Sequence, residues 1–490
     1  MDAISQGPKV PRSPDELGVP LAMVQDLTLR RALFEGRTST LRLSESLCLN
    51  PALMNELVEE LRELRYLEVH GLEGRDYLLG LTDLGREAAQ ERMRLCRYAG
   101  AVPVPLNDYK AMIDRQKASP EVTLELMESA FADLVVNPKL LNELGPALIA
   151  EGAMFLYGPP GTGKTSIAER MIRIHDDPVW VPRSVEVDSQ VITVFDPIAH
   201  EPIEPQPEDF DPRWVLCKRP CIIAGGELTG SMLDLTHEVT NGIYIAPLQM
   251  QANNGIFVID DFGRQTLTPE QLLNRWIVPL DRRVDFLSLS YGMKFSIPFD
   301  CKVVFSTNLQ PSSLGDEAFF RRIQNKILVP PISDEEFDTV LGRAAAKFNV
   351  TIEPGAPAYL RHVSRTQGDG DLRPYLPMEV CKILRAVCKY RNEPLVMNEA
   401  TIDAVAAVYF THSAAVMKDV EGLPSTTVNP ATAAPPTPPP PPAAAPPAAA
   451  VAPARTDIPE PPPRRLDPVA LIRESREARG QTADPAPKIF

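Results

Sequence analysis

A glycine-rich run between an apolar stretch and a helix constrains the fold of this 490-residue chain more than any other feature. The apolar run Ala153–Tyr157 predicts a buried strand, GPPGTGKT follows at residues 158–165, and Ser166–Met171 begins a helix. Glycines in such a loop let backbone N–H groups turn towards phosphate oxygens, and the helix N-terminus adds a partial positive charge. The order strand, loop, helix therefore predicts a phosphate-binding loop (P-loop) in an α/β fold with a parallel sheet.

The side chains of this loop have distinct expected roles. We expect Lys164 to supply a positive charge to the β- and γ-phosphates of a nucleotide, and Thr165 to place its hydroxyl on Mg²⁺. A glycine-rich turn without a ligand is the alternative, which the complete motif in its context disfavours. The residues expected to bind the nucleotide are Gly158, Pro159, Pro160, Gly161, Thr162, Gly163, Lys164, Thr165 and Ser166.

Two carboxylates follow a second apolar strand, about ninety residues after the P-loop. Asp260 and Asp261 come directly after Gly255–Ile259, at the carboxyl end of that strand, where open α/β sheets bind their ligands. We expect Asp260 to hold Mg²⁺ through water and Asp261 to polarise an attacking water. A third apolar strand, Lys302–Phe305, leads to Asn308, whose amide can orient that water or contact the γ-phosphate.

Two further arginine-containing segments complete the pattern: DEAFFRR at residues 316–322 and GDLR at residues 370–373. Together these motifs resemble the AAA+ ATPase family over about residues 123–418. The resemblance implies that Asn308 is sensor 1 and Arg373 a sensor 2 candidate. It also implies that Arg321 or Arg322 is an arginine finger reaching a neighbouring subunit, whereas a surface ion pair is the alternative for each arginine. ATP and Mg²⁺ as cofactors and a homo-oligomer, expected to be a hexamer, follow from the resemblance.

Two segments resemble those of one branch of the AAA+ family. Residues Arg282–Pro298 are expected to form a β-hairpin, and the loop Gly225–Gly230 precedes the acidic strand. Both are typical of the AAA+ branch with MoxR-type and enhancer-binding ATPases, where such elements touch the substrate. The chain departs from the family at Asp261, where glutamate is usual, and the shorter side chain is expected to slow hydrolysis. Residues Val179–Arg219 are expected to form an insertion in which His200 is structural rather than a ligand.

Changes in periodicity and composition divide the chain into segments. Helix, helix, helix, hairpin, helix is the order of a winged helix-turn-helix domain, and the Pro/Ala-rich run after Pro424 cannot bury a core. Residues 466–478 are either part of a disordered end or a short docking helix. The expected segments are a flexible N-terminus at 1–18, a winged-helix-like domain at 19–97, a linker at 98–122, a nucleotide-binding α/β domain at 123–331, a helical lid at 332–418 and a disordered tail at 419–490.

The charge of the chain bears on its partners. The net charge is −15, and the expected recognition helix Pro51–Arg65 carries more glutamates than arginines. Like charge opposes DNA phosphates, so a protein client is favoured over DNA. Two functions remain open: ATP-dependent remodelling of an unidentified protein in an oligomer, and a DNA-bound regulator switched by ATP. No C-x-x-C pair, signal peptide or apolar membrane span is evident, so we expect a cytoplasmic protein.

Overall fold

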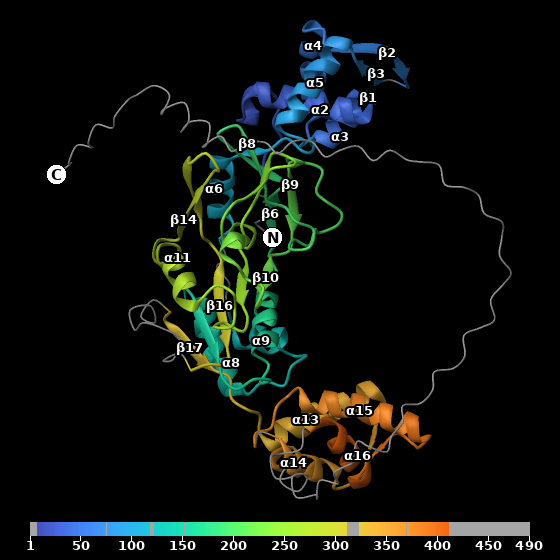
Figure 1. Cartoon of the computed structure of the whole chain (residues 1–490), viewed down its shortest axis with the longest axis vertical. Coiled ribbons are helices and arrows are strands. Elements are labelled where there is room, and N and C mark those ends of the chain that lie inside the picture. The colour runs from blue at the N-terminus through green and yellow to red at the C-terminus, as the bar shows by residue number, and fades with distance from the viewer. Residues whose placement is uncertain are drawn as a thin grey trace, which may run out of the picture. The chain divides into compact units, whose positions relative to one another are not determined.

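The computed structural model of the chain describes residues 7–74, 76–117, 122–150, 152–310, 323–368 and 370–410 (Figure 1). The segment DEAFFRR and the expected tail at 419–490 lie outside these residues. Within the described residues, none of the helices combines the length and apolar character that a membrane span needs.

Four helices and a three-stranded sheet form the N-terminal unit, in the order that the sequence predicts. Asn50 caps one helix by accepting the N–H of Ala52 at 2.8 Å, and Thr82 caps another by accepting that of Gly85 at 3.0 Å. The short strand β1, which the sequence does not predict, pairs antiparallel with β3. The elements are α2 (Leu21–Glu35), β1 (Arg37–Ser39), α3 (Thr40–Leu47), α4 (Pro51–Glu63), β2 (Leu67–Glu73), β3 (Asp76–Leu81) and α5 (Asp83–Leu95).

Residues 98–122 were expected to be a linker, but their described part is structured. Strand β4 (Val104–Pro105) pairs with a strand eighty residues further along the chain, and α6 (Leu106–Arg115) follows. The spacing of Tyr109, Met112 and Ile113 places all three on one buried face of α6. Burial of this face explains why the segment folds.

The expected flexible N-terminus is also structured from residue 7 onwards. The N–H of Asp211 donates to the carbonyl of Pro8 at 3.0 Å, and Leu17 is fully buried. The guanidinium of Arg213 donates to the carbonyl of Leu17 at 3.2 Å and forms a buried ion pair with Asp211 at 2.8 Å. These contacts tie the segment to residues of the expected insertion.

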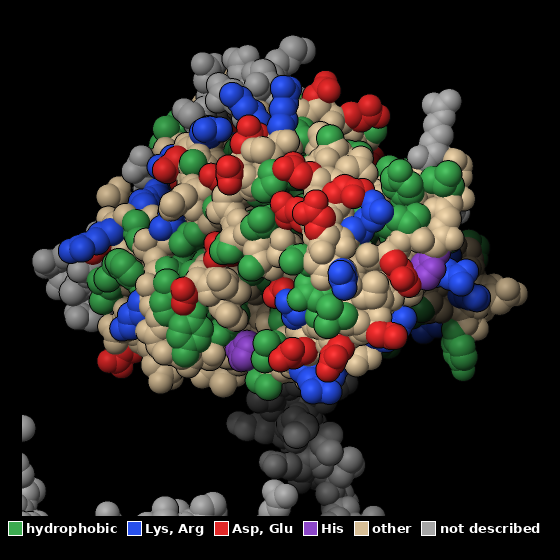
Figure 2. Space-filling model, turned by 90° about the horizontal axis from the view of Figure 1, so that it is seen from above, with side chains coloured by type: hydrophobic (Ala, Val, Ile, Leu, Met, Phe, Trp, Pro, Cys, Tyr) green, Lys and Arg blue, Asp and Glu red, His purple; other side chains and the backbone are tan. Residues whose placement is uncertain are grey.

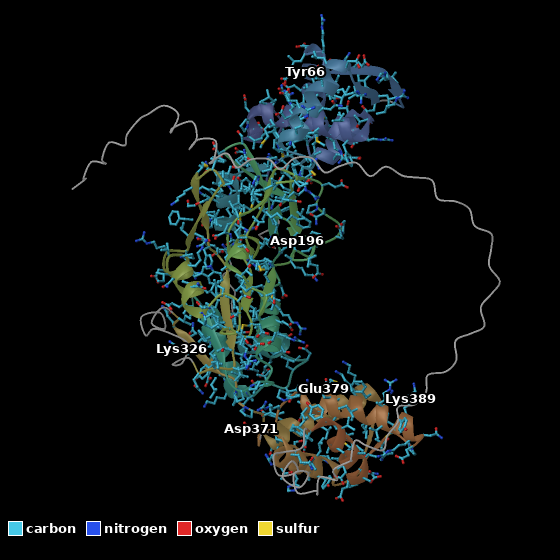
Figure 3. All side chains as sticks on the ribbon, viewed as in Figure 1. Tyr66, Asp196, Lys326, Asp371, Glu379 and Lys389 are labelled. Atoms are coloured by element: carbon cyan, nitrogen blue, oxygen red, sulfur yellow. The ribbon has the colours of Figure 1, made fainter. Side chains whose placement is uncertain are left out.

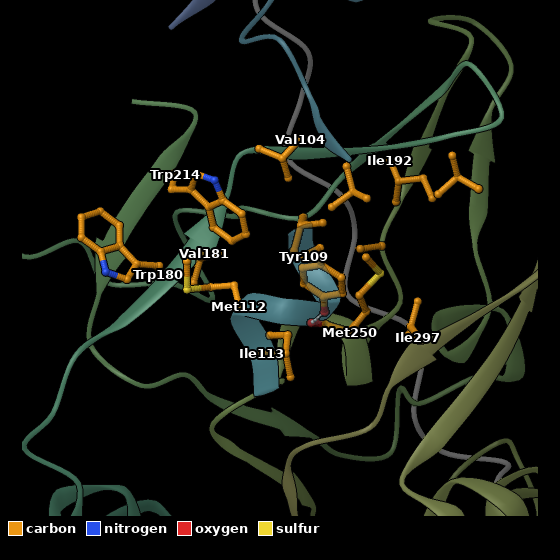
Figure 4. Close-up of a cluster of buried hydrophobic side chains, with 14 of the residues drawn as sticks. Val104, Tyr109, Met112, Ile113, Trp180, Val181, Ile192, Trp214, Met250 and Ile297 are labelled. Carbon is orange, nitrogen blue, oxygen red and sulfur yellow. Dashed lines mark hydrogen bonds between the residues drawn. The ribbon is translucent and has the colours of Figure 1, made fainter. Parts of the chain in front are cut away.

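Residues 179–219, which were expected to form an insertion, contribute four strands of a β unit. Its sheet has the order β11-β12-β8-β7-β4, and β6 pairs with β9. Aromatic and aliphatic side chains from these strands and from α6 form one core, in which Tyr109 donates to the carbonyl of Met250 at 3.3 Å (Figure 4). The strands are β6 (Val179–Pro182), β7 (Ser184–Val187), β8 (Gln190–Thr193), β9 (Trp214–Cys217), β11 (Thr236–Glu238) and β12 (Ile243–Ile245).

The expected β-hairpin is confirmed and belongs to the same core. Strands β14 (Val284–Ser288) and β15 (Lys294–Pro298) pair antiparallel. Leu287, Leu289 and Ile297 are buried among the side chains of the β unit. The hairpin is therefore packed against this unit along its length.

A five-stranded parallel sheet in the order β10-β13-β16-β5-β17 forms the α/β unit, which confirms the predicted parallel α/β fold. Alternate residues of the central strands β5, β13 and β16 enter one of two hydrophobic clusters, so both faces of these strands are buried and they read as continuous apolar runs. Pro146 lies inside α8 without ending it. The elements are α7 (Leu124–Ala130), α8 (Pro138–Ile149), β5 (Met154–Tyr157), α9 (Lys164–Arg170), β10 (Cys221–Ala224), α10 (Leu248–Gln251), β13 (Ile256–Ile259), α11 (Pro269–Arg282), β16 (Lys302–Thr307) and β17 (Asn325–Leu328).

A buried polar network joins the β unit to the amino end of β13. The side-chain amide of Asn254 donates to Asp300 at 2.6 Å and to the carbonyl of Ile113 at 3.0 Å. Gln116 donates to the side chain of Asn254 at 3.0 Å, and Arg219 donates to the Asn254 carbonyl at 2.6 Å. The start of β13 is thus fixed to the end of α6.

The last described part is helical, as expected. Ser333 and Glu336 form a capping box at the start of its first helix, where Asp334 and Glu335 also favour the helix N-terminus. The elements are α13 (Asp334–Phe348), β18 (Thr351–Ile352), α14 (Ala356–Gln367), α15 (Leu376–Arg391), β19 (Val396–Met397) and α16 (Glu399–Tyr409).

Candidate nucleotide-binding site

The P-loop lies at the point where the order of the parallel sheet reverses. The chain returns across the sheet from β10 through β13 to β16, and then crosses β5 to form β17 on its other side. Ligands of open α/β sheets bind outside the carboxyl ends of the strands at such a switch point. Residues 158–163, which follow β5, are therefore placed at the expected edge of the sheet.

Glycines are required in this loop by backbone conformation and by close approach. Gly158, Gly161 and Gly163 have φ angles of 149°, 77° and 91°. A Cβ on Gly158 would lie 2.3 Å from the carbonyl oxygen of Val329, the residue after β17. A side chain does not fit at Gly158, so the close approach of the chain after β17 requires a glycine at this position of the loop.

Lys164 is held in place by three acceptors. Its ammonium donates to the carbonyls of Gly158 at 3.0 Å and Pro159 at 2.9 Å, and to Oδ1 of Asn308 at 2.7 Å. Burial lowers the pKa of Lys164, whereas the charges of Asp260 and Asp261 raise it. The loop thus presents an oriented ammonium group at the site where phosphates are expected.

Thr165 and Asp260 meet across the site. The hydroxyl of Thr165 donates to Oδ2 of Asp260 at 2.7 Å. Hydroxyl and carboxylate oxygens are the protein ligands that Mg²⁺ takes when nucleotide phosphates and waters supply the others. Within the described residues no group of three His, Cys, Asp or Glu side chains could hold a metal by itself. The pair therefore fits a magnesium ion shared with phosphates.

Asn308 bridges the P-loop lysine and the second carboxylate. Its Oδ1 accepts from Lys164, and its Nδ2 donates to Oδ1 of Asp261 at 3.1 Å. Asp261 has a φ of 48°, an uncommon conformation for a residue other than glycine, and its carboxylate is exposed. The arrangement leaves an acidic group and an amide side by side, beside the ammonium.

The turn that carries both aspartates is braced by residues that the sequence does not single out. Gln265 donates to the carbonyl of Asp260 at 2.7 Å and accepts the N–H of Gly263 at 2.9 Å. Phe262 is buried, and its ring lies 5.7 Å from that of Phe155 and 5.0 Å from that of Phe305. An Asp-Asp pair gives no local signal of such a brace, which depends on strands far apart in the sequence.

A cavity of about 650 Å³ contains this arrangement. Residues from the α7–α8 connection and from the start of α15 also line it, and the sequence indicated none of them. Glu379, labelled on the helical unit in Figure 3, is one of these. The additional lining residues are Leu134, Val135, Val136, Arg264, Pro374, Tyr375, Met378 and Glu379.

The structure brings one of the three candidate arginines to the P-loop. Arg373 lowers the pKa of Lys164 by its charge, and its Cδ would lie 3.5 Å from a Cβ on Gly161. Arg321 and Arg322 lie outside the described residues. His200 is buried, with Nε2 2.9 Å from the carbonyl of Gln251, so its structural role is confirmed.

Replacing Gly161 with alanine should reduce ATP affinity about tenfold or more. The φ of 77° costs an alanine about 1–2 kcal/mol, and its Cβ would lie 2.3 Å from the ring of Tyr375. Gly342→Ala is the matched control, because position 342 is helical with open space around it. Calorimetric titration of both variants checks this, and equal affinities would contradict it.

Comparisons with known proteins leave the function open. The model of a domain of unknown function, DUF8689, matches residues 333–408, which span most of the helical unit. None of the curated proteins matches the chain. Similar solved structures include the RuvB Holliday junction branch migration motor of Thermotoga maritima, 15% identical with a TM-score of 0.33 over 60% of this chain and 72% of that one.

Two variants of that RuvB are 13% and 14% identical, with TM-scores of 0.32 and 0.33 over 60% of this chain and 73% of theirs. Similarity this low does not carry an activity or a partner over to the present chain.

Proposed function

We propose that the chain binds ATP with Mg²⁺ and hydrolyses it to ADP and phosphate. The observation that carries this proposal is the convergence of Lys164, Thr165, Asp260, Asp261 and Asn308 at one edge of the parallel sheet. Lys164 and Thr165 come from the P-loop, Asp260 and Asp261 come from the turn after β13, and Asn308 directly follows β16. Hydrogen bonds of 2.7–3.1 Å connect the three segments.

Each of these five residues has its own proposed role in ATP binding or hydrolysis. Lys164 binds the β- and γ-phosphates, while Thr165 and Asp260 hold Mg²⁺, which when bound offsets charge on the phosphates. Asp261 accepts a hydrogen bond from the attacking water and polarises it, and Asn308 orients that water. The Asp261 side chain is short for this task, so a slow turnover is part of the proposal.

Membership of the AAA+ family belongs to the same proposal. Arg373 is proposed as sensor 2, which its position near Gly161 and Lys164 supports. Residues 332–418 are proposed as the helical lid. Arg321 or Arg322 is proposed as a finger acting on a neighbouring subunit in a homo-oligomer, expected to be a hexamer. These assignments rest on the sequence resemblance.

Asp261→Asn should lower kcat for ATP hydrolysis about 100-fold or more, because an amide cannot accept a proton as a carboxylate does. ATP affinity should be nearly unchanged, since Asp261 is not expected to hold the metal. Glu270→Gln, an exposed change at the start of α11, is the control. Phosphate release and ATP titration measure the two quantities. Wild-type protein that binds no nucleotide would refute the proposed function.

A protein client, rather than DNA, is the proposed partner. On α4, Glu56, Glu59 and Glu63 are exposed, and Arg62 is engaged in an ion pair with Glu59 at 2.5 Å. Figure 2 shows the molecule from above. Acidic side chains gather near the middle of the visible face of the molecule, and basic side chains are scattered around them. Such a surface repels DNA phosphates, which supports the remodelling of a protein over a DNA-bound switch.

A further inference from the structure

Arg264 enters the cavity from the turn that carries the two aspartates. It lies three residues after Asp261, and its N–H donates to the carbonyl of Asp261 at 3.0 Å. It lines the same cavity as Lys164 and Asn308. None of the roles proposed above uses its guanidinium.

The backbone at Arg264 is fixed while its side chain is exposed. Phe262 donates its N–H to the carbonyl of Ser306 at 2.7 Å, and the hydroxyl of Thr307 donates to the carbonyl of Phe262 at 2.8 Å. Gln265 braces the other side of the turn. Across the described residues, the guanidinium of Arg264 makes no hydrogen bond or ion pair with another residue. A rigid turn therefore carries a cation that is available to a ligand of this cavity.

The negative charges that line the cavity favour a further positive group near the phosphates. Asp260 and Asp261 both line the cavity where phosphates are expected. Of the five hydrogen-bonded residues of the site, Lys164 is the one with a positive charge, and Arg373 lies beside the P-loop. Mg²⁺ held by Thr165 and Asp260 would offset part of this negative charge, but the carboxylate of Asp261 would still repel the γ-phosphate where water is partly excluded. An arginine fork can donate two hydrogen bonds to one phosphate group.

We propose that Arg264 is a catalytic residue that contacts the γ-phosphate of ATP bound to its own chain. The contact lowers the repulsion between the γ-phosphate and the two aspartates, and it persists as charge redistributes during hydrolysis. This inference rests on the proposed ATPase function. It predicts a dependence on the third phosphate, which distinguishes it from a general effect on nucleotide binding.

The test compares ADP with the slowly hydrolysed analogue ATPγS by calorimetric titration with Mg²⁺, at a protein concentration where light scattering shows one oligomeric state. For Arg264→Ala, ATPγS affinity should fall about 10- to 100-fold while ADP affinity stays within about twofold of the wild type. Arg264→Lys keeps the positive charge but cannot donate two parallel hydrogen bonds to one phosphate. Its ATPγS affinity should therefore lie between those of Arg264→Ala and the wild type. Arg282→Ala removes an exposed arginine at the end of α11, away from the cavity lining, and should behave as wild type.

The possible outcomes distinguish a failure of the proposed ATPase function from a failure of the proposed role of Arg264. Wild-type protein that binds neither nucleotide overturns the proposed function itself. Wild-type binding with an unchanged ATPγS to ADP affinity ratio in Arg264→Ala overturns the role of Arg264 alone. A loss confined to the assembled form, with unchanged ratios in the dissociated protein, would assign Arg264 to a subunit interface and also overturn the contact within one chain.

Discussion

Lys164→Ala should lower ATP affinity at least about 100-fold while the folded structure persists. The ammonium is fixed by the carbonyls of Gly158 and Pro159, so it meets the phosphates without further ordering. Its loss removes charge-assisted hydrogen bonds, each of which contributes about 1.5–3 kcal/mol. It also leaves Asp260 and Asp261 facing the phosphates without a lysine between them. Calorimetric titration with ATP measures the change.

The fold should persist because the ammonium bonds to two carbonyls of the P-loop and to the side chain of Asn308, and none of these three acceptors belongs to a hydrophobic cluster. Lys139→Ala, on the exposed side of α8, is the matched control for loss of a lysine near this part of the fold. An unchanged ATP affinity in Lys164→Ala, with normal thermal unfolding, would mean that the P-loop does not bind ATP phosphates.

Arg213→Met should destabilise the β unit by about 3–5 kcal/mol. Arg213 and Asp211 are 3% exposed each and form an ion pair at 2.8 Å, and the arginine also donates to the carbonyls of Leu17 and Pro103. Removing one partner of a buried pair leaves an uncompensated charge, which accounts for most of the cost. Urea unfolding followed by the fluorescence of Trp180 and Trp214 reports on this core.

The double variant Arg213→Met/Asp211→Leu is the control for this effect. It removes both charges, so it should recover much of the stability lost by the single change. A single variant as stable as the wild type would show that the buried pair contributes little. A double variant as unstable as the single one would place the cost in the lost bonds to Leu17 and Pro103.

The α/β unit could be predicted from the sequence because its signals are local. Each strand is a short apolar run, and the chemically active residues follow those runs directly, as Asp260 and Asn308 do. The parallel sheet then brings them together without further information. The assignment of Arg321 and Arg322 stays a prediction, since they lie outside the described residues.

The β unit could not be predicted in the same way. Strand β4 pairs with β7, about eighty residues away, and a two-residue strand has no periodicity to detect. The apolar face of α6 is short, and it was read as part of a linker. The cavity walls at Arg264 and Tyr375 were missed for a similar reason, because only the folded chain places them beside the P-loop.

The polar network around Asn254 has a mechanical consequence. Asn254, just before strand β13, is bonded to Gln116 and Arg219, and Asp260 directly follows the strand. Four extended residues form a stiff rod of about 13 Å. If the proposed hydrolysis displaces the aspartates, the strand would transmit the displacement, because its amino end is held by the bonds of Asn254. We expect a displacement of strand β13 to be transmitted to α6. The hairpin, which shares the core of the β unit, would then move together with that unit.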